Sequence, residues 1–246
     1  MTTFRVSPGT VPVRAVFGPT IQGEGPMAGR LSAFIRFGGC NLHCPPCDTK
    51  DTWDRDTFPL EQLLAWNPPL TAAQVLAQLA ALADTVPPLV VLTGGEPLLH
   101  QRTTVFEEIL AGIPASSTVQ VETNGTIAAA ERARELLYVV SPKICGSMAT
   151  GDPGARRVKP HAIEAFAALA QGGRAWFKFV CSSADDVGAC AEFCAAHGID
   201  IARSAYIMPE GSTLEDATET HRRIMPAVLR FGFNTTGRLH LSLDVP

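Results

Sequence analysis

Three cysteines stand close together near the start of the chain, in the segment GGCNLHCPPCDTK that covers residues 38–50. Cys40, Cys44 and Cys47 have the spacing C-x3-C-x2-C, so three thiolates can face one centre. Soft sulfur ligands select zinc, copper(I) or an iron–sulfur cluster. Three cysteines on a four-iron cluster leave one iron open for a substrate or cofactor, whereas a zinc site could take His43 as its fourth ligand. The loop by itself leaves both interpretations open.

A glycine-rich turn forms the second unusual segment. Thr93-Gly94-Gly95-Glu96-Pro97 comes directly after the apolar run 89–92. Two glycines let a ligand approach the backbone closely, and the Glu96 carboxylate could accept hydrogen bonds from an ammonium group. The same residues would also make an ordinary tight turn with Pro97 at the first helical position.

The elements that must position these segments are short β-rich runs that alternate with helical patterns. Continuous apolar runs are typical of strands buried on both faces, and the alternation indicates βαβ units with a mainly parallel sheet. Thr71, Thr126 and Ser183 or Ser182 are predicted N-caps. The predicted strands are residues 32–37, 89–92, 118–122, 137–140, 176–181, 205–208 and 239–243, and the predicted helices are residues 72–82, 105–111, 127–136, 162–170, 184–196 and 214–229.

The unusual segments stand where predicted strands end. They cover residues 38–47, 93–97, 122–126, 141–143 and 208–211. Because the carboxyl ends of parallel strands meet at one rim, we expect a single large site there.

Length and composition predict one domain over residues 1–246, with residues 51–70 as an irregular insertion that holds three prolines and two tryptophans. A charged fraction of 18% and a net charge of −4 disfavour a nucleic-acid-binding protein. No run of 18 apolar residues is present, which disfavours a membrane span, and residues 1–10 lack the pattern of a secretory signal.

The seven cysteines are an odd number in a chain with no visible signal, which favours the reducing cytoplasm and a metal site over a disulfide framework. The four outside the first loop do not form a second three-cysteine loop. We predict that they are buried free thiols, with a second cluster as the less favoured alternative. These four are Cys145, Cys181, Cys190 and Cys194.

Taken together, the C-x3-C-x2-C loop and the GGEP turn resemble the radical S-adenosylmethionine superfamily. Other segments narrow the resemblance to the 7-carboxy-7-deazaguanine synthase family, over residues 16–240. A glycyl-radical activase acting on a partner protein, which the QGEG segment argues against, and a non-enzymatic zinc-binding module are the alternatives. The narrowing segments are residues 20–25, Arg36, 47–49, 122–125, 141–143, 208–211 and 238–240.

This resemblance implies a lyase with a modified, partial (β/α)6 barrel. The enzyme would convert 6-carboxy-5,6,7,8-tetrahydropterin to 7-carboxy-7-deazaguanine with loss of ammonia, for queuosine and other 7-deazapurines. The implied cofactors are a 4Fe–4S cluster, S-adenosylmethionine that is regenerated each turnover, and Mg²⁺. The implied partners are a flavodoxin-like or other electron donor and a second copy of the chain in a homodimer.

The resemblance also implies roles for individual residues, none of them as a catalytic side chain. Cys40, Cys44 and Cys47 would bind the cluster, and Thr49 would bind magnesium. Substrate contacts are expected from Ile21, Gln22, Gly23, Arg36, Thr93, His240 and the terminal carboxylate of Pro246. Contacts to S-adenosylmethionine are expected from Pro46, Asp48, Gly95, Glu96, Ser141, Pro142, Lys143, Met208, Pro209 and Glu210.

Overall fold

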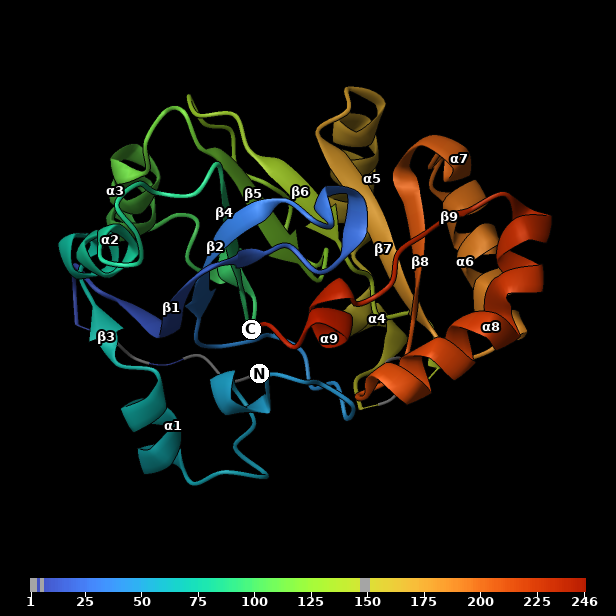
Figure 1. The fold of residues 1–246 in the computed structure, drawn as a ribbon, viewed down its shortest axis with the longest axis horizontal. Coiled ribbons are helices and arrows are strands. Elements are labelled where there is room, and N and C mark those ends of the chain that lie inside the picture. Colours follow the sequence, from blue (N-terminus) through green and yellow to red (C-terminus); the bar gives the residue numbers. More distant parts are fainter. Residues whose placement is uncertain (1–3, 5–6, 147–150) are drawn as a thin grey trace.

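The computed structural model describes residue 4 and residues 7–146 and 151–246. Within these residues, nine strands form one sheet in the order β3-β1-β2-β4-β5-β6-β7-β8-β9 (Figure 1). Strands β2, β4, β5, β6, β7, β8 and β9 pair in parallel, whereas β1 is antiparallel to both β2 and β3. The outermost strands do not pair with each other, so the predicted mainly parallel, partial barrel is confirmed as an open sheet.

The strands are β1 (Val11–Ile21), β2 (Leu31–Phe37), β3 (Pro69–Leu70), β4 (Leu89–Gly94), β5 (Thr118–Thr123), β6 (Leu137–Val140), β7 (Ala175–Cys181), β8 (Ala205–Pro209) and β9 (Asn234–Thr235). The helices are α1 (Leu60–Trp66), α2 (Ala72–Ala80), α3 (Thr104–Gly112), α4 (Gly154–Arg157), α5 (Pro160–Gln171), α6 (Ala184–Ala196), α7 (Ile201–Ser204), α8 (Leu214–Phe231) and α9 (Leu239–Leu243), with short 3-10 turns η1 (Gly25–Met27), η2 (Lys50–Thr52) and η3 (Pro97–Leu99).

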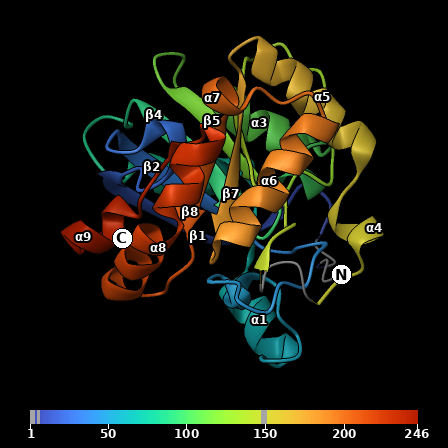
Figure 2. The ribbon, with the colours of Figure 1, turned by 90° about the vertical axis from the view of Figure 1, so that its right-hand side faces the viewer.

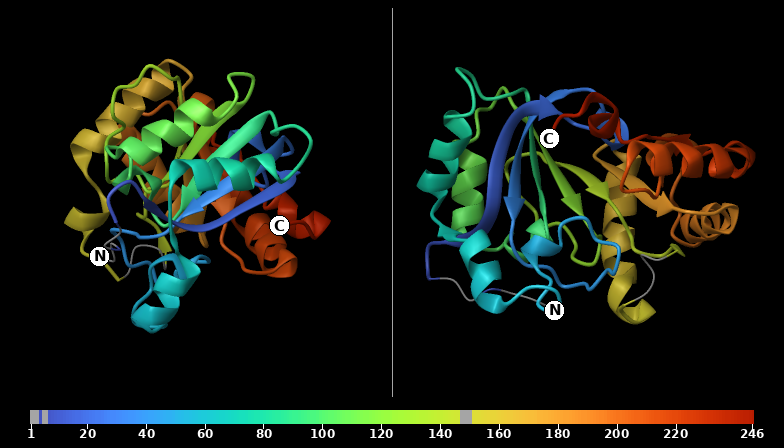
Figure 3. Two further views of the ribbon diagram at one scale, coloured as in Figure 1. Left: turned by 90° about the vertical axis from the view of Figure 1, so that its left-hand side faces the viewer. Right: turned by 60° about the horizontal axis from the view of Figure 1, so that its bottom comes forward.

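The two faces of the sheet have different surroundings. Helices α2, α3, α5, α6 and α8 pack against one face and bury its apolar side chains in the main core. Figure 2 shows α5 and α6 on the same side of β7, and Figure 3 shows α2 and α3 along one flank with α6 and α8 along the other. Because side chains alternate along a strand, β7 sends Phe177 and Phe179 into this core and Lys178 to the opposite face. The opposite face is therefore free to carry polar, functional side chains.

Two predicted helix starts are confirmed. Thr71 and Gln74 form a capping box at the start of α2, and Ser183 and Asp186 form one at the start of α6. Each box satisfies backbone N–H groups that the first helical turn leaves without partners. No helix among the described residues is both long enough and apolar enough to cross a membrane.

The predicted strand 239–243 is wrong, because these residues form the helix α9. Alternating apolar residues in LHLSL suggested a strand, but the segment takes no part in the nine-stranded sheet of the described residues. Its first residue instead donates its N–H to the Gly23 carbonyl at 2.9 Å, and Asp244 ends the helix in the left-handed conformation with φ of 51°.

The predicted helix 127–136 is also wrong, since this stretch is irregular. Its polar groups find partners on other elements instead of within a helix. Ala130 N–H donates to Gln101 Oε1 at 2.9 Å, and the Arg134 guanidinium donates to four carbonyls between Leu110 and Ser117. These long-range bonds replace the local i to i−4 ladder.

Several elements lie where the sequence predicted none, among them β1 and α1. Strand β1 contains Pro12 and Pro19, which disfavour a central strand but are tolerated near a sheet edge. The segment 51–70, predicted to be irregular, contains η2 and α1 and ends in β3. Helix α1 projects below the rest of the chain in Figure 1.

Candidate functional site

A cavity of about 970 Å³ opens at the carboxyl ends of the parallel strands, as the rim argument predicted. The cysteine loop forms part of its wall, and side chains from β2, β4, β5, β7 and β8 form the face of the sheet beneath it. Helix α9 and the chain terminus complete the wall, and both lie in front of the sheet in Figure 1. The volume is at the upper end of the range for small-molecule sites, which suits two ligands side by side.

The three cysteines of the first loop all line this cavity. Cys40 and Cys44 are buried, and Cys47 accepts a hydrogen bond from Trp53 Nε1–H at 3.3 Å. Leu42 N–H lies 3.5 Å from Cys40 Sγ. Burial raises the pKa of Cys40 to about 12, so binding of a metal centre here must displace protons.

The spacing of these thiols distinguishes a cluster from a single ion. One zinc ion would hold its thiolates within about 4.6 Å of one another, because each Zn–S bond is about 2.3 Å long. Cys40, Cys44 and Cys47 are not among the described sets of three ligands whose atoms lie within 4.8 Å of one another. The wider spacing fits a multi-iron cluster, whose cysteines bind different irons.

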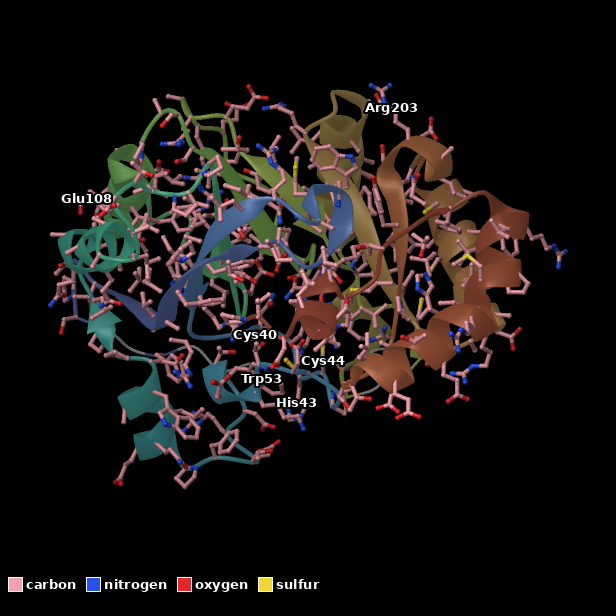
Figure 4. All side chains as sticks on the ribbon, viewed as in Figure 1. Cys40, His43, Cys44, Trp53, Glu108 and Arg203 are labelled. Atoms are coloured by element: carbon pink, nitrogen blue, oxygen red, sulfur yellow. The ribbon has the colours of Figure 1, made fainter. Side chains whose placement is uncertain are left out.

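The fourth ligand considered for a zinc site faces elsewhere. His43 Nε2 lies 3.6 Å from Asp56 Oδ2, and the His43 ring contacts the Trp53 ring with centroids 4.9 Å apart. Figure 4 shows His43 on the outer side of the loop, farther from the strands than Cys40 and Cys44. The geometry therefore does not support a Cys3His zinc site.

The two glycines after β4 permit a close backbone approach to the cysteine loop. A Cβ on Gly95 would lie 2.0 Å from the Gly39 carbonyl oxygen, and Gly94 has φ of 121°. Glu96 N–H donates to the same Gly39 oxygen at 2.8 Å. The turn is thus joined directly to the loop that carries Cys40.

The Glu96 carboxylate lies behind this turn and not in the cavity wall. It is fully buried and accepts hydrogen bonds from Leu98 N–H, Thr123 Oγ1–H and Asn124 N–H at 2.8–3.0 Å. These bonds tie the end of β4 to the end of β5. The ammonium contact of Glu96 stays a prediction, whereas Gly95 does line the cavity.

Arg36 on β2 and Glu122 on β5 line the sheet face of the cavity. The Arg36 guanidinium lies over the Phe17 ring, 5.1 Å from its centroid, and its buried Nε has no hydrogen-bond partner among the described residues. Glu122 accepts hydrogen bonds from Thr93 Oγ1–H at 2.8 Å and Gln22 Nε2–H at 3.1 Å. A buried donor without a partner is costly, so Arg36 is poised for an acceptor on a ligand.

An ion network links Lys178 on β7 to Asp48 in the cysteine loop, and its side chains other than Asp48 are largely buried. Lys178 Nζ forms an ion pair with Glu24, and Arg238 Nε donates to Glu24 Oε1 at 3.0 Å. Arg238 Nη2 also donates to Asp48 Oδ2 at 2.8 Å. Burial alone would raise the pKa of Glu24, but the two cations outweigh it and lower the pKa to about 2. Glu24 is therefore a carboxylate at neutral pH.

The chain terminus reaches the same cavity. Pro246 lines the wall, and its carbonyl-group oxygen accepts a hydrogen bond from Thr20 Oγ1–H at 2.9 Å. His240 also lines the wall, and burial lowers its pKa. A Cβ on Gly23 would lie 2.0 Å from His240 Nδ1, so a larger residue at this position would displace the His240 side chain. The terminus is held by specific contacts with β1.

Almost every residue predicted from the sequence as a contact is brought to this cavity. The exceptions are Glu96 and Pro142, which do not line it. Glu24, Lys178 and Glu122 also line the cavity, and none of them was predicted as a site residue from the sequence. A lone lysine within the apolar run WFKFV was the signal for Lys178, since a buried charge needs a partner.

Comparisons with known proteins agree with this geometry. The Radical SAM superfamily profile matches residues 34–175. The chain is 36% identical over 234 residues to the 7-carboxy-7-deazaguanine synthase of Hyperthermus butylicus, covering 92% of this chain and 90% of that protein. It is 35% identical over 226 residues to the enzyme of that name from Pyrobaculum aerophilum, covering 90% of each. The crystal structure of QueE from Escherichia coli superposes with a TM-score of 0.66 at 25% identity, covering 94% of this chain and 95% of that one. The chain therefore belongs to the 7-carboxy-7-deazaguanine synthase family of radical SAM proteins.

Proposed function

We propose that this protein is a radical S-adenosylmethionine lyase that converts 6-carboxy-5,6,7,8-tetrahydropterin to 7-carboxy-7-deazaguanine with loss of ammonia. One observation carries the proposal. A single cavity has three cysteines at one side and, on its wall, a buried arginine nitrogen with no hydrogen-bond partner in the described part of the chain. The first feature suits the cofactor and the second suits an anionic substrate.

Cys40, Cys44 and Cys47 would hold the cluster, and Trp53 would donate a hydrogen bond to the Cys47 sulfur. When bound, the cluster and S-adenosylmethionine supply a one-electron cleavage that produces the radical used on the substrate. Gly95, Ser141 and Lys143 line the adjoining wall, together with Pro46, Asp48, Met208, Pro209 and Glu210. These residues would position S-adenosylmethionine beside the open iron, with Glu96 and Pro142 supporting the wall from behind.

Arg36 would bind the substrate carboxylate, because a guanidinium pairs with a carboxylate through two parallel hydrogen bonds. Glu122 offers an acceptor for the amino and ring N–H groups of a pterin, and Gln22 on the same wall offers an N–H donor for its ring carbonyl. The terminal carboxylate of Pro246 offers a further acceptor. Ile21, Gly23, Thr93 and His240 complete the proposed substrate contacts.

Thr49 would supply a ligand to Mg²⁺. It lines the cavity, and its hydroxyl contacts Cys47 Sγ at 3.5 Å, a weak partner that a hard cation can displace. Magnesium prefers oxygen ligands and keeps several waters, so one hydroxyl together with a substrate carboxylate is a reasonable set.

The ion network would keep the cavity closed around these ligands. Arg238 joins Asp48 in the cysteine loop to Glu24, and Lys178 holds Glu24 against β7. The pairs of Glu24 with Lys178 and Arg238 are largely buried, so they hold Glu24 and the start of α9 in place with little competition from water, whereas the Asp48 end of the network is exposed.

An anaerobic turnover assay tests this function. The purified protein, with its cluster restored, is incubated with the carboxytetrahydropterin, S-adenosylmethionine and a chemical reductant, and the product mass is measured. Cys44→Ala should lose both the visible absorption of the cluster and the product. Cys194→Ala, which removes another buried thiol outside the cavity, should keep both. Product formation by Cys44→Ala at the unaltered rate would refute the proposal.

We also propose a cellular compartment, an electron donor and an oligomeric state for the enzyme. The seven cysteines are free thiols, which suits the cytoplasm, where a flavodoxin-like or other reductase would supply electrons. Family resemblance supports a homodimer. Light scattering on the holoenzyme tests the dimer, and a monomer mass at micromolar concentration would contradict it.

A further inference from the structure

Three cysteines from distant parts of the chain meet on the helix side of the sheet, away from the cavity. Cys145 Sγ lies 3.0 Å from Cys190 Sγ, and Cys181 Sγ lies 3.7 Å from Cys190 Sγ. All three sulfur atoms lie within 4.8 Å of one another, and all three side chains are at most 4% exposed. None of the three lines the cavity. The proposed reaction therefore gives this cluster of thiols no role.

Each thiol comes from a different element, and one side chain joins the three elements. Cys145 follows β6, Cys181 ends β7, and Cys190 lies in α6. Asp186, in the first turn of α6, accepts hydrogen bonds from Gly146 N–H at 2.9 Å and from Ser182 N–H at 2.9 Å. The residues that follow Cys145 and Cys181 are thus fixed to the helix that carries Cys190. The three sulfur atoms are held together by the fold before any ligand is present.

The separations match those expected for thiolates on one metal ion. Tetrahedral zinc with bonds of about 2.3 Å places its sulfur atoms about 3.8 Å apart. The Cys181–Cys190 separation of 3.7 Å fits this value, and the Cys145–Cys190 pair would open by about 0.8 Å, a small rotation of one side chain. Thiolates bound to different irons of a cluster stand farther apart, so this set does not suit a second 4Fe–4S cluster.

The three ligands are all sulfur atoms and are buried away from water, which limits the ions that could bind. Soft thiolates select zinc or copper(I) over magnesium, calcium or manganese. We propose that Cys145, Cys181 and Cys190 form a structural site for one thiophilic ion, zinc(II) or copper(I).

Such an ion would stabilise the cavity wall from the helix side of the sheet. Cys145 follows Ser141 and Lys143 by a few residues, and Ser182, next to Cys181, also lines the cavity. An ion that ties β6, β7 and α6 together would hold these segments at a fixed separation.

Metal analysis of the anaerobically purified holoenzyme tests the site. The protein carries a non-chelating tag at its amino terminus and is produced in medium with zinc and copper. Zinc, copper, iron and sulfide are measured per chain. Cys190→Ala is compared with Cys194→Ala, because both residues are fully buried in α6 one turn apart and only Cys190 belongs to the set.

We expect about one ion of zinc or copper per chain in the wild type and in Cys194→Ala, and less than about a tenth of that in Cys190→Ala. The iron content should be equal in all three proteins, which separates this site from Cys40, Cys44 and Cys47. Whichever of the two ions is found identifies the occupant. If Cys190→Ala does not fold, Cys181→Ala is measured instead. The zinc or copper content of the folded wild type also decides by itself whether an ion is bound.

Three results would overturn the inference. One is a folded wild type without zinc or copper beyond the level in Cys190→Ala. Another is a Cys145–Cys190 disulfide in peptide mass maps of the anaerobic protein. The third is additional iron, lost with Cys190, in place of zinc or copper.

Discussion

Replacing Glu24 with glutamine tests the ion network that closes the cavity. The substitution keeps the size of the side chain but removes the charge that pairs with Lys178 and Arg238. Lys178 then keeps its ammonium group in a buried position without its closest anion. Breaking a buried pair in this way typically costs about 3–5 kcal/mol of stability.

The pKa of Glu24 gives a second value for the free energy that its ion pairs contribute to stability. A pKa lowered from 4.5 to about 2 corresponds to about 3 kcal/mol at neutral pH, because each tenfold change in proton affinity is worth about 1.4 kcal/mol. The side chain is 15% exposed, so solvent screening reduces this value only slightly. A depressed carboxyl pKa contributes stability that is complete above the unfolded value and is lost as pH falls from about 4.5 towards about 2. The loss caused by Glu24→Gln should therefore be constant between about pH 5 and pH 8.

The assay is anaerobic urea unfolding of the wild type and Glu24→Gln at equal cluster content, repeated at several pH values in that range. Glu61→Gln serves as the control, because Glu61 is an exposed carboxylate on α1. Its substitution should change the free energy of unfolding by less than about 0.5 kcal/mol. A loss below about 1 kcal/mol for Glu24→Gln, or a loss that varies with pH across the range, would refute the reasoning.

Three further predictions concern the ligands. Arg36→Ala should raise the apparent substrate constant about ten- to hundredfold, because a charge-assisted hydrogen bond is worth about 1.5–3 kcal/mol, while S-adenosylmethionine affinity hardly changes; equal loss of both affinities would show a folding defect. Thr49→Ala should slow turnover and weaken its dependence on magnesium with the cluster intact, and identical rate curves against magnesium would contradict the assignment. A tag after Pro246 should raise the substrate constant much more than a tag before Met1, because it converts the terminal carboxylate at the cavity into an amide; equal constants at equal cluster content would show that Pro246 is only a chain end.

The sequence by itself determined the type of chemistry and the class of fold. Cys40, Cys44 and Cys47 lie within eight residues, so their meeting at one centre needs only a local loop. Strand–helix alternation predicted the parallel sheet, and the shared rim of parallel strands predicted that the distant unusual segments would form one cavity. These inferences succeed because they depend on local periodicity and on a general rule of parallel sheets.

The tertiary structure decided which buried polar groups face each other. Lys178 meets Glu24 across 154 residues of sequence, and no local pattern specifies that pairing. Residues 239–243 have the alternation of a strand, yet contacts with Gly23 make them a helix at the cavity. Cys145, Cys181 and Cys190 look like scattered thiols until β6, β7 and α6 are packed together. Hydrophobic periodicity reports which face of an element is buried, but only packing brings a given partner to that face.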